Sequence, residues 1–390
     1  RMEVIIITIE FHNGLSVIES LGQKGILTNV IDVTDEPKPY MLCSKYVKQG
    51  WKCKSNEDAV SILLNDFKVD GEKALLISCS DDATAMLDKH YDELKDKFIL
   101  PLTSFHGHQE EIMSKQYMSN LAQNIGMNIP ETWLLEKGQE IPEDIIYPCI
   151  TKAISSVAGT KIDNIRVCNN YEELKSFVNS SGHSATLQIQ RFIDKAFEFQ
   201  FLGCSFNDGN EIVISGRTHI DRPNGRENTF FLRFDKVENE LKPLENKVRE
   251  FISETKYNGP FSVEFLRDKN GTDYFTEMNF RNDGNAYCQT YAGINVPYIM
   301  YLYYSGGDYK SELEKSDVRR IYMVPEFEYL QFKLSGEFGW KEWYRNMKKA
   351  NCYNTYFKQD KAVFRQFLLN RITGFIRRRV RRFFQLKASV

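Results

Sequence analysis

The chain has 390 residues, enough for two or three domains rather than one small core. Hydrophobic residues make up 42% and charged residues 27%, and the net charge of −2 argues against a general affinity for nucleic acid. The sequence contains no apolar run of the roughly 20 residues that would span a bilayer. The eight cysteines are scattered without a CxxC pair, which argues against a structural zinc site and favours reduced thiols in a cytoplasmic setting.

The N-terminal third alternates between apolar runs and helical patterns. Residues 3–9 (EVIIITI) form a continuous apolar run, which is typical of a parallel strand buried on both faces and not of a signal peptide. Further runs occur at residues 26–33 and 73–81, with helical patterns between them. This alternation predicts a small doubly wound, Rossmann-like α/β domain over residues 2–105. The turn after the first strand lacks GxGxxG, so a dinucleotide site is not indicated.

Helices and hairpins are predicted in the middle of the chain. Residues 114–126 and 171–179 have helical patterns. Between residues 185 and 220 the pattern is strand-rich, and an Asp-Gly pair there predicts a hairpin turn. A helix at 241–257 is expected to precede a second hairpin over residues 259–281. The sequence therefore predicts a strand-rich region flanked by helices.

The second hairpin carries a set of oxygen donors. Glu277 and Asn279 are two residues apart, so their side chains leave the same face of one strand. If Glu264 on the preceding strand faces the same side, two carboxylates and an amide oxygen converge, which are hard ligands suited to Mg²⁺. Arg281 is then placed to bind a phosphoryl group or a substrate carboxylate. The alternative is the solvent-facing acidic side of an amphipathic hairpin.

Residues 259–284 resemble the metal-binding end of the ATP-grasp superfamily, whose pattern is an acidic residue on one strand and E-x-N-x-R on the next. The resemblance covers roughly residues 3–300 and includes the branch of D-aspartate ligase and related carboxylate–amine ligases, with carbamoyl-phosphate synthase large chains more distant. It implies an α/β and α+β architecture, with an ATP-grasp fold preceded by the Rossmann-like domain. ATP and Mg²⁺ are the implied cofactors, with Mn²⁺ as an alternative ion. The implied metal ligands are Glu264, Glu277 and Asn279.

Motifs further upstream match the nucleotide contacts of that family. Lys115 and Lys152 stand at its two phosphate-binding lysines, although Ala153 replaces the proline that usually follows the second. Residues 155–161 (SSVAGTK) resemble the mobile loop that covers the phosphates. Glu198 matches the ribose-binding acid. The adenine hinge is implied at QRFI, which consists of Gln190, Arg191, Phe192 and Ile193, with Gln190 where glutamate is usual.

The resemblance implies acyl-phosphate chemistry. A substrate carboxylate takes the γ-phosphate of ATP, and an amine captures the mixed anhydride to form an amide, on a substrate derived from an amino acid or the cell envelope. The implied catalytic residues are Arg217 and Arg281, because phosphoryl transfer needs its negative charge held in place. Arg222 and Arg226 lie in a loop that is a candidate for holding an anionic substrate. Two alternatives stay open: a non-catalytic ATP-binding or scaffold protein, and carboxyphosphate chemistry with bicarbonate.

The remaining predictions concern domains and partners. Residues 106–185 are expected to form the first half of the ATP-grasp fold, residues 186–310 the second half with the metal site, and residues 311–390 a helical extension. Apolar residues spaced by three and four over 361–385 predict a basic amphipathic helix. It either contacts anionic lipid at the inner face of a membrane or packs on the core with a solvated basic face. The expected partners are a small carboxylate and an amine, without nucleic acid, and a homodimer is left open.

Overall fold

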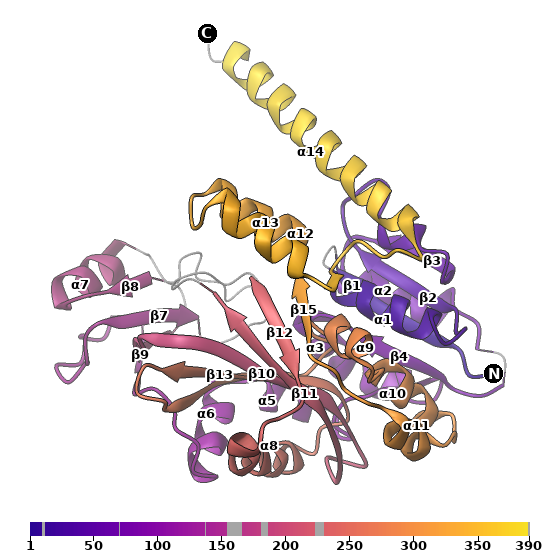
Figure 1. The fold of residues 1–390 in the computed structure, drawn as a ribbon, viewed down its shortest axis with the longest axis horizontal. Helices are drawn as coiled ribbons and strands as arrows, with labels where there is room; N and C mark the ends of the chain where they lie inside the picture. The colour runs from indigo at the N-terminus through magenta and orange to yellow at the C-terminus, as the bar shows by residue number, and fades with distance from the viewer. Residues whose placement is uncertain are drawn as a thin grey trace.

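Three β-sheets organise the structure, a computed structural model shown in Figure 1. It describes residues 1–9, 12–69, 71–136, 138–153, 166–180, 186–222 and 230–388, with the side chains of 152–153 and 378–388 outside the description. The chain enters a five-stranded sheet, then a four-stranded sheet, and then a seven-stranded sheet. The mixed α/β architecture predicted from the sequence is confirmed.

The N-terminal sheet is parallel, with the strand order β3-β2-β1-β4-β5. Its elements are β1 (Val4–Ile9), α1 (Asn13–Gly22), β2 (Thr28–Val33), η1 (Met41–Cys43), β3 (Val47–Cys53), α2 (Asn56–Asn65), β4 (Ala74–Ser78), α3 (Asp81–Lys89), α4 (Tyr91–Leu94) and β5 (Phe98–Ile99). β1 and β4 are almost completely buried, as their continuous apolar runs predict. The strand order reverses between β1 and β4, which places a topological switch point at their carboxyl ends.

The four-stranded sheet is antiparallel and has the order β6-β9-β7-β8. It follows two short helices, and the elements are α5 (His108–Ile112), α6 (Lys115–Asn124), β6 (Thr132–Leu135), β7 (Cys149–Ala153), β8 (Arg166–Cys168), α7 (Tyr171–Ser180) and β9 (Leu187–Arg191). Helix α7 covers one face, where its Leu174 and Phe177 pack with Leu187 and Ile189 of β9. The opposite face carries the alternate residues of β7 and β9.

The seven-stranded sheet has the order β14-β13-β10-β11-β12-β15-β16. Its elements are β10 (Lys195–Phe206), β11 (Glu211–Asp221), β12 (Phe231–Asp235), η2 (Asn239–Leu241), α8 (Lys242–Thr255), β13 (Gly259–Asp268), β14 (Asp273–Asn279), β15 (Ile321–Val324) and β16 (Cys352–Tyr353). Both predicted hairpins are present, as β10–β11 and β13–β14. Helices α6 and α8 pack on one face over an aromatic core that includes Phe199, Phe201 and Phe265.

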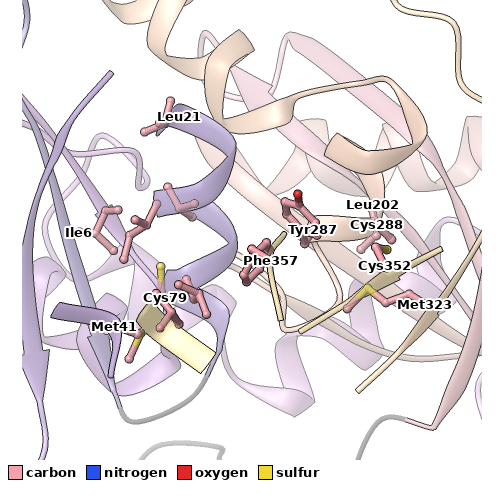
Figure 2. Close-up of a cluster of buried hydrophobic side chains, with 14 of the residues drawn as sticks. Ile6, Leu21, Met41, Cys79, Leu202, Tyr287, Cys288, Met323, Cys352 and Phe357 are labelled. Carbon is pink, nitrogen blue, oxygen red and sulfur yellow. The ribbon is translucent and has the colours of Figure 1, made fainter. Parts of the chain in front are cut away.

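The C-terminal part ties the large sheet to the N-terminal domain. Its helices are α9 (Tyr287–Ala292), α10 (Val296–Tyr304), α11 (Tyr309–Lys315), α12 (Glu326–Leu334), α13 (Trp340–Lys349) and α14 (Lys361–Ala388). One apolar cluster joins Leu21 of α1 to Leu202 of β10, Tyr287 of α9 and Phe357 before α14 (Figure 2). The segment predicted as a helical extension also contributes two strands to the large sheet, because β15 pairs with β12 and β16 pairs with β15.

Candidate nucleotide and metal site

Three neighbouring strands bring a row of polar side chains to one face of the large sheet. The strand register pairs Gln200 of β10 with Glu264 of β13, and Glu264 with Glu277 of β14. One step along the same strands, Ser262 pairs with Asn279. Because directly paired residues of antiparallel strands point to the same face, the three predicted metal ligands share one side of the sheet.

Hydrogen bonds connect this row around Glu264. Its Oε1 accepts from Gln200 Nε2 and from Asn279 Nδ2, each at 2.9 Å. Burial, together with the charges of Glu277 and Asp283, raises the pKa of Glu264 to about 8. Two carboxylates held this close repel when both are ionised, and a divalent cation removes that cost. The pair therefore fits a hard cation such as Mg²⁺.

Asn279 fits a cation only through its amide oxygen. In this structure its nitrogen faces Glu264, while its Oδ1 accepts from Arg281 Nη2 at 3.1 Å. As a ligand, the Asn279 oxygen would have to turn toward the two carboxylates. Within the part of the chain that the structure describes, there is no group of three His, Cys, Asp or Glu side chains suited to a metal. The candidate cation site is therefore an acid pair completed by an amide.

Arg281 is held between the hairpin and the N-terminal domain. Its Nε lies 3.2 Å from Asp81 Oδ1, and its Nη1 lies 3.5 Å from Asp283 Oδ2. Burial disfavours the charge of Arg281, but Asp81, Asp283 and the hairpin carboxylates outweigh it and raise the pKa of the guanidinium. A fixed positive charge thus lies beside the acidic row, where a phosphoryl group or a carboxylate would be stabilised.

The loop after Arg281 contacts the N-terminal sheet at its switch point. Asn282 Nδ2 donates to the carbonyl oxygen of Asn13, at the start of α1, at 2.7 Å. Asp81 begins α3 directly after β4 and pairs with Arg281. A Cβ on Gly284 would come within 3.0 Å of Asn13 Oδ1, closer than ordinary van der Waals contact. Because ligands of open parallel sheets bind at the switch point, the acidic row and the N-terminal domain face one shared site.

The predicted hinge links the four-stranded sheet to β10. The N–H of Arg191 donates to Glu131 O at 2.8 Å, and the N–H of Phe192 donates to Pro148 O at 2.9 Å. Across the described residues, the N–H of Ile193 has no backbone partner. Of these three hinge amides, the one at Ile193 therefore suits an external acceptor such as an adenine ring nitrogen.

Gln190 and Lys152 occupy one face of the four-stranded sheet. The register sets Lys152 opposite Gln188, and Gln188 and Gln190 are two residues apart on β9, so all three positions share a side. Gln190 Nε2 donates to Thr132 Oγ1 at 3.1 Å. The side chain of Lys152 and the predicted phosphate loop, residues 155–161, lie outside the described residues.

Lys115 is the first residue of α6. One turn later, Met118 Sδ accepts from the N–H of Met278, which lies between Glu277 and Asn279 on β14. This contact holds the start of the helix beside the strand that carries two of the predicted ligands. Met118 and Met278 belong to the core on the sheet face opposite to the acidic row, so this contact does not bring Lys115 to the row, and its phosphate role stays a prediction.

A second charged group lies next to the acidic row. Glu198 is two residues before Gln200 on β10 and so faces the same side. It forms ion pairs with Lys195 and with Arg222, whose Nη1 lies 3.1 Å from Glu198 Oε2. The charge of Arg222 also favours the ionised form of Glu264. The predicted ribose-binding acid and this arginine thus extend the site from the hinge to the cation-binding pair, while Arg226 lies outside the described residues.

Arg217 is not part of this group. It pairs with Phe201, on the sheet face that α6 and α8 cover, and its guanidinium lies over the ring of Phe199. Its Nε and Nη2 bind both carboxylate oxygens of Glu238, at 2.7 and 2.5 Å. Because neighbouring strand residues face opposite sides, Thr218 and not Arg217 lies in the row with Gln200. The predicted role of Arg217 at the transferred phosphate has no geometric support here.

Several residues of the site escaped the sequence prediction. They are Gln200, Thr218, Asp81, Asp283 and Asn285, and the last donates to Gln200 Oε1 at 3.2 Å. Strand periodicity could have found Gln200, because it follows Glu198 by two residues in the segment FEFQF. Asp81 is the first residue of α3 and Asp283 lies in the loop after β14, and only the tertiary fold brings both to Arg281.

Comparison with known proteins agrees with this geometry. Residues 112–296 match the family described as carbamoyl-phosphate synthase L chain, ATP binding domain. A biotin carboxylase from Nostoc sp. is 28% identical over 156 residues, which cover 37% of this chain and 34% of the relative. The small subunit of 2-oxoglutarate carboxylase from Hydrogenobacter thermophilus is 28% identical over 157 residues, 38% of this chain and 32% of the relative. The matches thus span about a third of the length of these curated relatives.

Solved structures show the same fold at low identity. The L-amino acid ligase of Bacillus licheniformis superposes with a TM-score of 0.63 and 17% identity, over 83% of this chain and 79% of the ligase. The N5-carboxyaminoimidazole synthetase of Staphylococcus aureus gives a TM-score of 0.63 with 14% identity, over 86% of both chains. The biotin carboxylase domain of the Hydrogenobacter thermophilus enzyme, solved with MgADP and bicarbonate, gives 0.62 with 18% identity, over 83% of this chain and 74% of that one. Residues 112–296 are therefore similar to the ATP-binding domain of the carbamoyl-phosphate synthase L chain, within a chain that has the ATP-grasp fold.

Proposed function

We propose that this protein is a ligase that joins a carboxylate to an amine at the expense of ATP, with Mg²⁺ and an acyl-phosphate intermediate. The observation that carries the proposal is the cross-strand pair of Glu264 and Glu277 beside Arg281 on one sheet face. An acid pair alone supports only a cation site. Together with the hinge and the family match, it supports an ATP site whose phosphates meet the cation.

The acidic and the basic side chains of the site have different proposed roles. Glu264, Glu277 and the turned Asn279 oxygen would hold Mg²⁺, which supplies charge neutralisation at the nucleotide phosphates. Arg281 stabilises the carboxylate and the transferred phosphoryl group, because its charge is fixed by Asp81 before substrate arrives. Lys115 and Lys152 are proposed phosphate contacts. Arg217 is retained only as a structural ion pair with Glu238.

The acceptor substrate is proposed to bind where the Arg281 loop meets the switch point. Asn13 and His12 line this corner at the start of α1, and the imidazole lies against Gly284. Removal from water lowers the pKa of His12 to about 4, against the opposing charge of Asp283, so its ring is neutral near pH 7. A neutral imidazole can accept a hydrogen bond from the amino group of a substrate. A small amino-acid-derived substrate fits this chemistry.

A second candidate is carboxyphosphate chemistry with bicarbonate. It is favoured by one observation: both curated relatives described above are a carboxylase or a carboxylase subunit. The two candidate reactions share the ATP site and differ in the anion that Arg281 would bind, a substrate carboxylate or bicarbonate. Dependence of ADP formation on bicarbonate, in buffers freed of carbon dioxide, would favour the carboxyphosphate reaction.

The deciding experiment measures ADP and phosphate release across a panel of amino acids and small amines, with and without bicarbonate. We expect turnover that needs a carboxylate and an amine together and that Glu277→Gln strongly reduces. Glu250→Gln, on the exposed side of α8, is the matched control and should behave as the parent protein. A chain that binds ATP but releases no ADP with any substrate pair would instead support the non-catalytic scaffold.

The cellular setting is part of the proposal. All eight cysteines are free thiols, and seven of them are buried. Reduced thiols of this kind support the proposed cytoplasmic location. Among the described residues, no helix has the length and apolar character to cross a membrane.

A further inference from the structure

Helix α14 has a fixed base. Val363 and Phe367 are buried in the apolar cluster that includes α1, and the ring of Phe367 meets Tyr40 edge-on at 5.3 Å. Asn370 Nδ2 donates to the carbonyl oxygen of Lys38 at 2.9 Å. Beyond this point the helix extends away from the body of the protein (Figure 1). Its first turns therefore set the direction of a projecting helix.

The projecting part exposes large apolar side chains. Five of them are between 41% and 56% exposed: Leu368, Leu369, Ile372, Phe375 and Ile376. At 3.6 residues per turn, spacings of three and four place most of them along one side of the helix. The sequence continues this spacing at Val380 and Phe383. The core therefore covers only the first turns of α14 and leaves this stripe of apolar side chains exposed.

The same segment is strongly basic. Residues 361–390 contain nine lysines and arginines and no acidic residue, and the run RRRVRR occupies 377–382. Arg371 stacks on Phe327 and Phe367 near the base, and Arg377 is exposed. An apolar stripe beside a cluster of arginines is complementary to a surface that is apolar beneath and anionic above.

We propose that α14, from Leu368 onward, lies in the interface of an anionic membrane. The apolar stripe enters the acyl region, and the arginines contact the lipid phosphates. A nucleic acid or an acidic protein would engage the arginines but leave the five apolar side chains in water. A second copy of the chain would cover the apolar stripe but bring two clusters of positive charge together.

The test uses the full chain and sedimentation with vesicles. We expect binding to phosphatidylcholine mixed with phosphatidylglycerol and little binding to phosphatidylcholine alone. Ile372→Glu with Ile376→Glu should reduce binding to background, because two charges replace exposed apolar groups. Removing three charges by Arg377→Gln, Arg378→Gln and Arg379→Gln should weaken binding on the order of 100-fold, at about 1 kcal/mol per charge.

A matched control removes the same charge from α13. Lys341, Arg345 and Lys348 are all exposed there, and changing them to Gln should leave vesicle binding nearly unchanged. Equal loss in the two triple variants would overturn the proposal, since it would show a general charge effect. Equal binding to both vesicle types would also overturn the proposal. So would a dimer of the parent protein in sedimentation velocity that becomes a monomer when Ile372 and Ile376 are changed to Glu.

Discussion

Two buried acid pairs in this protein have similar electrostatics and different surroundings. Glu264 lies opposite Glu277 on the large sheet, and Glu19 of α1 lies beside Asp360 just before α14. Burial is the largest cause in both cases, and it raises the pKa of each of the two glutamates to about 8. A strong shift in pKa therefore does not by itself distinguish a functional site from a structural joint.

The difference lies in what surrounds each pair. Glu19 accepts from Gln359 at 3.0 Å, and Asp360 accepts from Ser44 Oγ at 2.5 Å and from the Lys45 N–H at 3.1 Å. These hydrogen bonds hold the C-terminal segment against the N-terminal domain, and we call this contact the Glu19 joint. Glu264 instead shares its sheet face with other polar groups, and the charge of Arg222, just after β11, favours its ionised form. Donors reach both pairs, but those of Glu19 and Asp360 join two segments of the chain, whereas Glu264 lies in a row of polar side chains that three strands bring to one sheet face.

The largest expected effect comes from the sheet pair. Glu277→Gln or Glu264→Gln should lower kcat/KM on the order of 1,000-fold, because each removes one carboxylate from the proposed cation site. Glu19→Gln, a change of the same kind in an equally buried acid, should leave kcat/KM within about twofold. Steady-state ADP release measures all three. Similar losses in all three variants would erase the distinction between the two pairs.

A smaller effect is expected at Asp81, which positions Arg281 from the other domain. Asp81→Asn removes one charge partner, so the guanidinium loses part of its orientation and kcat should fall about tenfold. The KM for ATP should stay unchanged, since Asp81 is not near the hinge. Glu57→Gln, an exposed acid in the first turn of α2, is the control. A rise in the KM for ATP without loss of kcat would contradict a positioning role.

The two acid pairs should also differ in whether they release a proton when Mg²⁺ binds. With a pKa of about 8, Glu264 holds its proton at pH 7, and a cation must displace it. Mg²⁺ binding should therefore release about one proton at pH 7 and almost none at pH 9. Calorimetry in two buffers of different ionisation enthalpy counts the protons. Glu264→Gln should abolish the release, and Glu19→Gln should preserve it; proton release that survives Glu264→Gln would refute the assignment.

The sequence predicted the part of the site that strand periodicity controls. Glu264, Glu277 and Asn279 were expected on one face because side chains alternate along a strand, and the register confirms that placement. Arg217 was assigned from the family resemblance and not from alternation, and the register places it opposite Phe201, on the other face of the sheet. The register of β10 with β11 shifts at a bulge between Leu202 and Gly203, and the local amino-acid composition does not predict such a shift.

Contacts between distant segments were beyond prediction from one sequence. Asp81 and Arg281 are 200 positions apart, and nothing in the sequence around either residue indicates the other. Asn13 and Asn282 likewise meet only because the loop after β14 reaches the switch point of the first sheet. The fold class and the N-terminal parallel sheet were predictable, since continuous apolar runs identify strands buried on both faces.

The smallest expected effect concerns stability at the Glu19 joint. In the unfolded chain a glutamate ionises near its usual value of about 4.5, whereas folded Glu19 keeps its proton up to about pH 8. The unfolded state therefore binds fewer protons between these values, and stability falls as the pH rises through this window. Glu19→Gln removes that slope, so its Tm should exceed that of the parent protein by about 2 °C or more at pH 8.5 and match it near pH 4.5. Equal Tm differences at both pH values would mean that the glutamate is stabilised by its contacts with Gln359 rather than penalised by burial, and the two acid pairs would then differ in electrostatics as well as in surroundings.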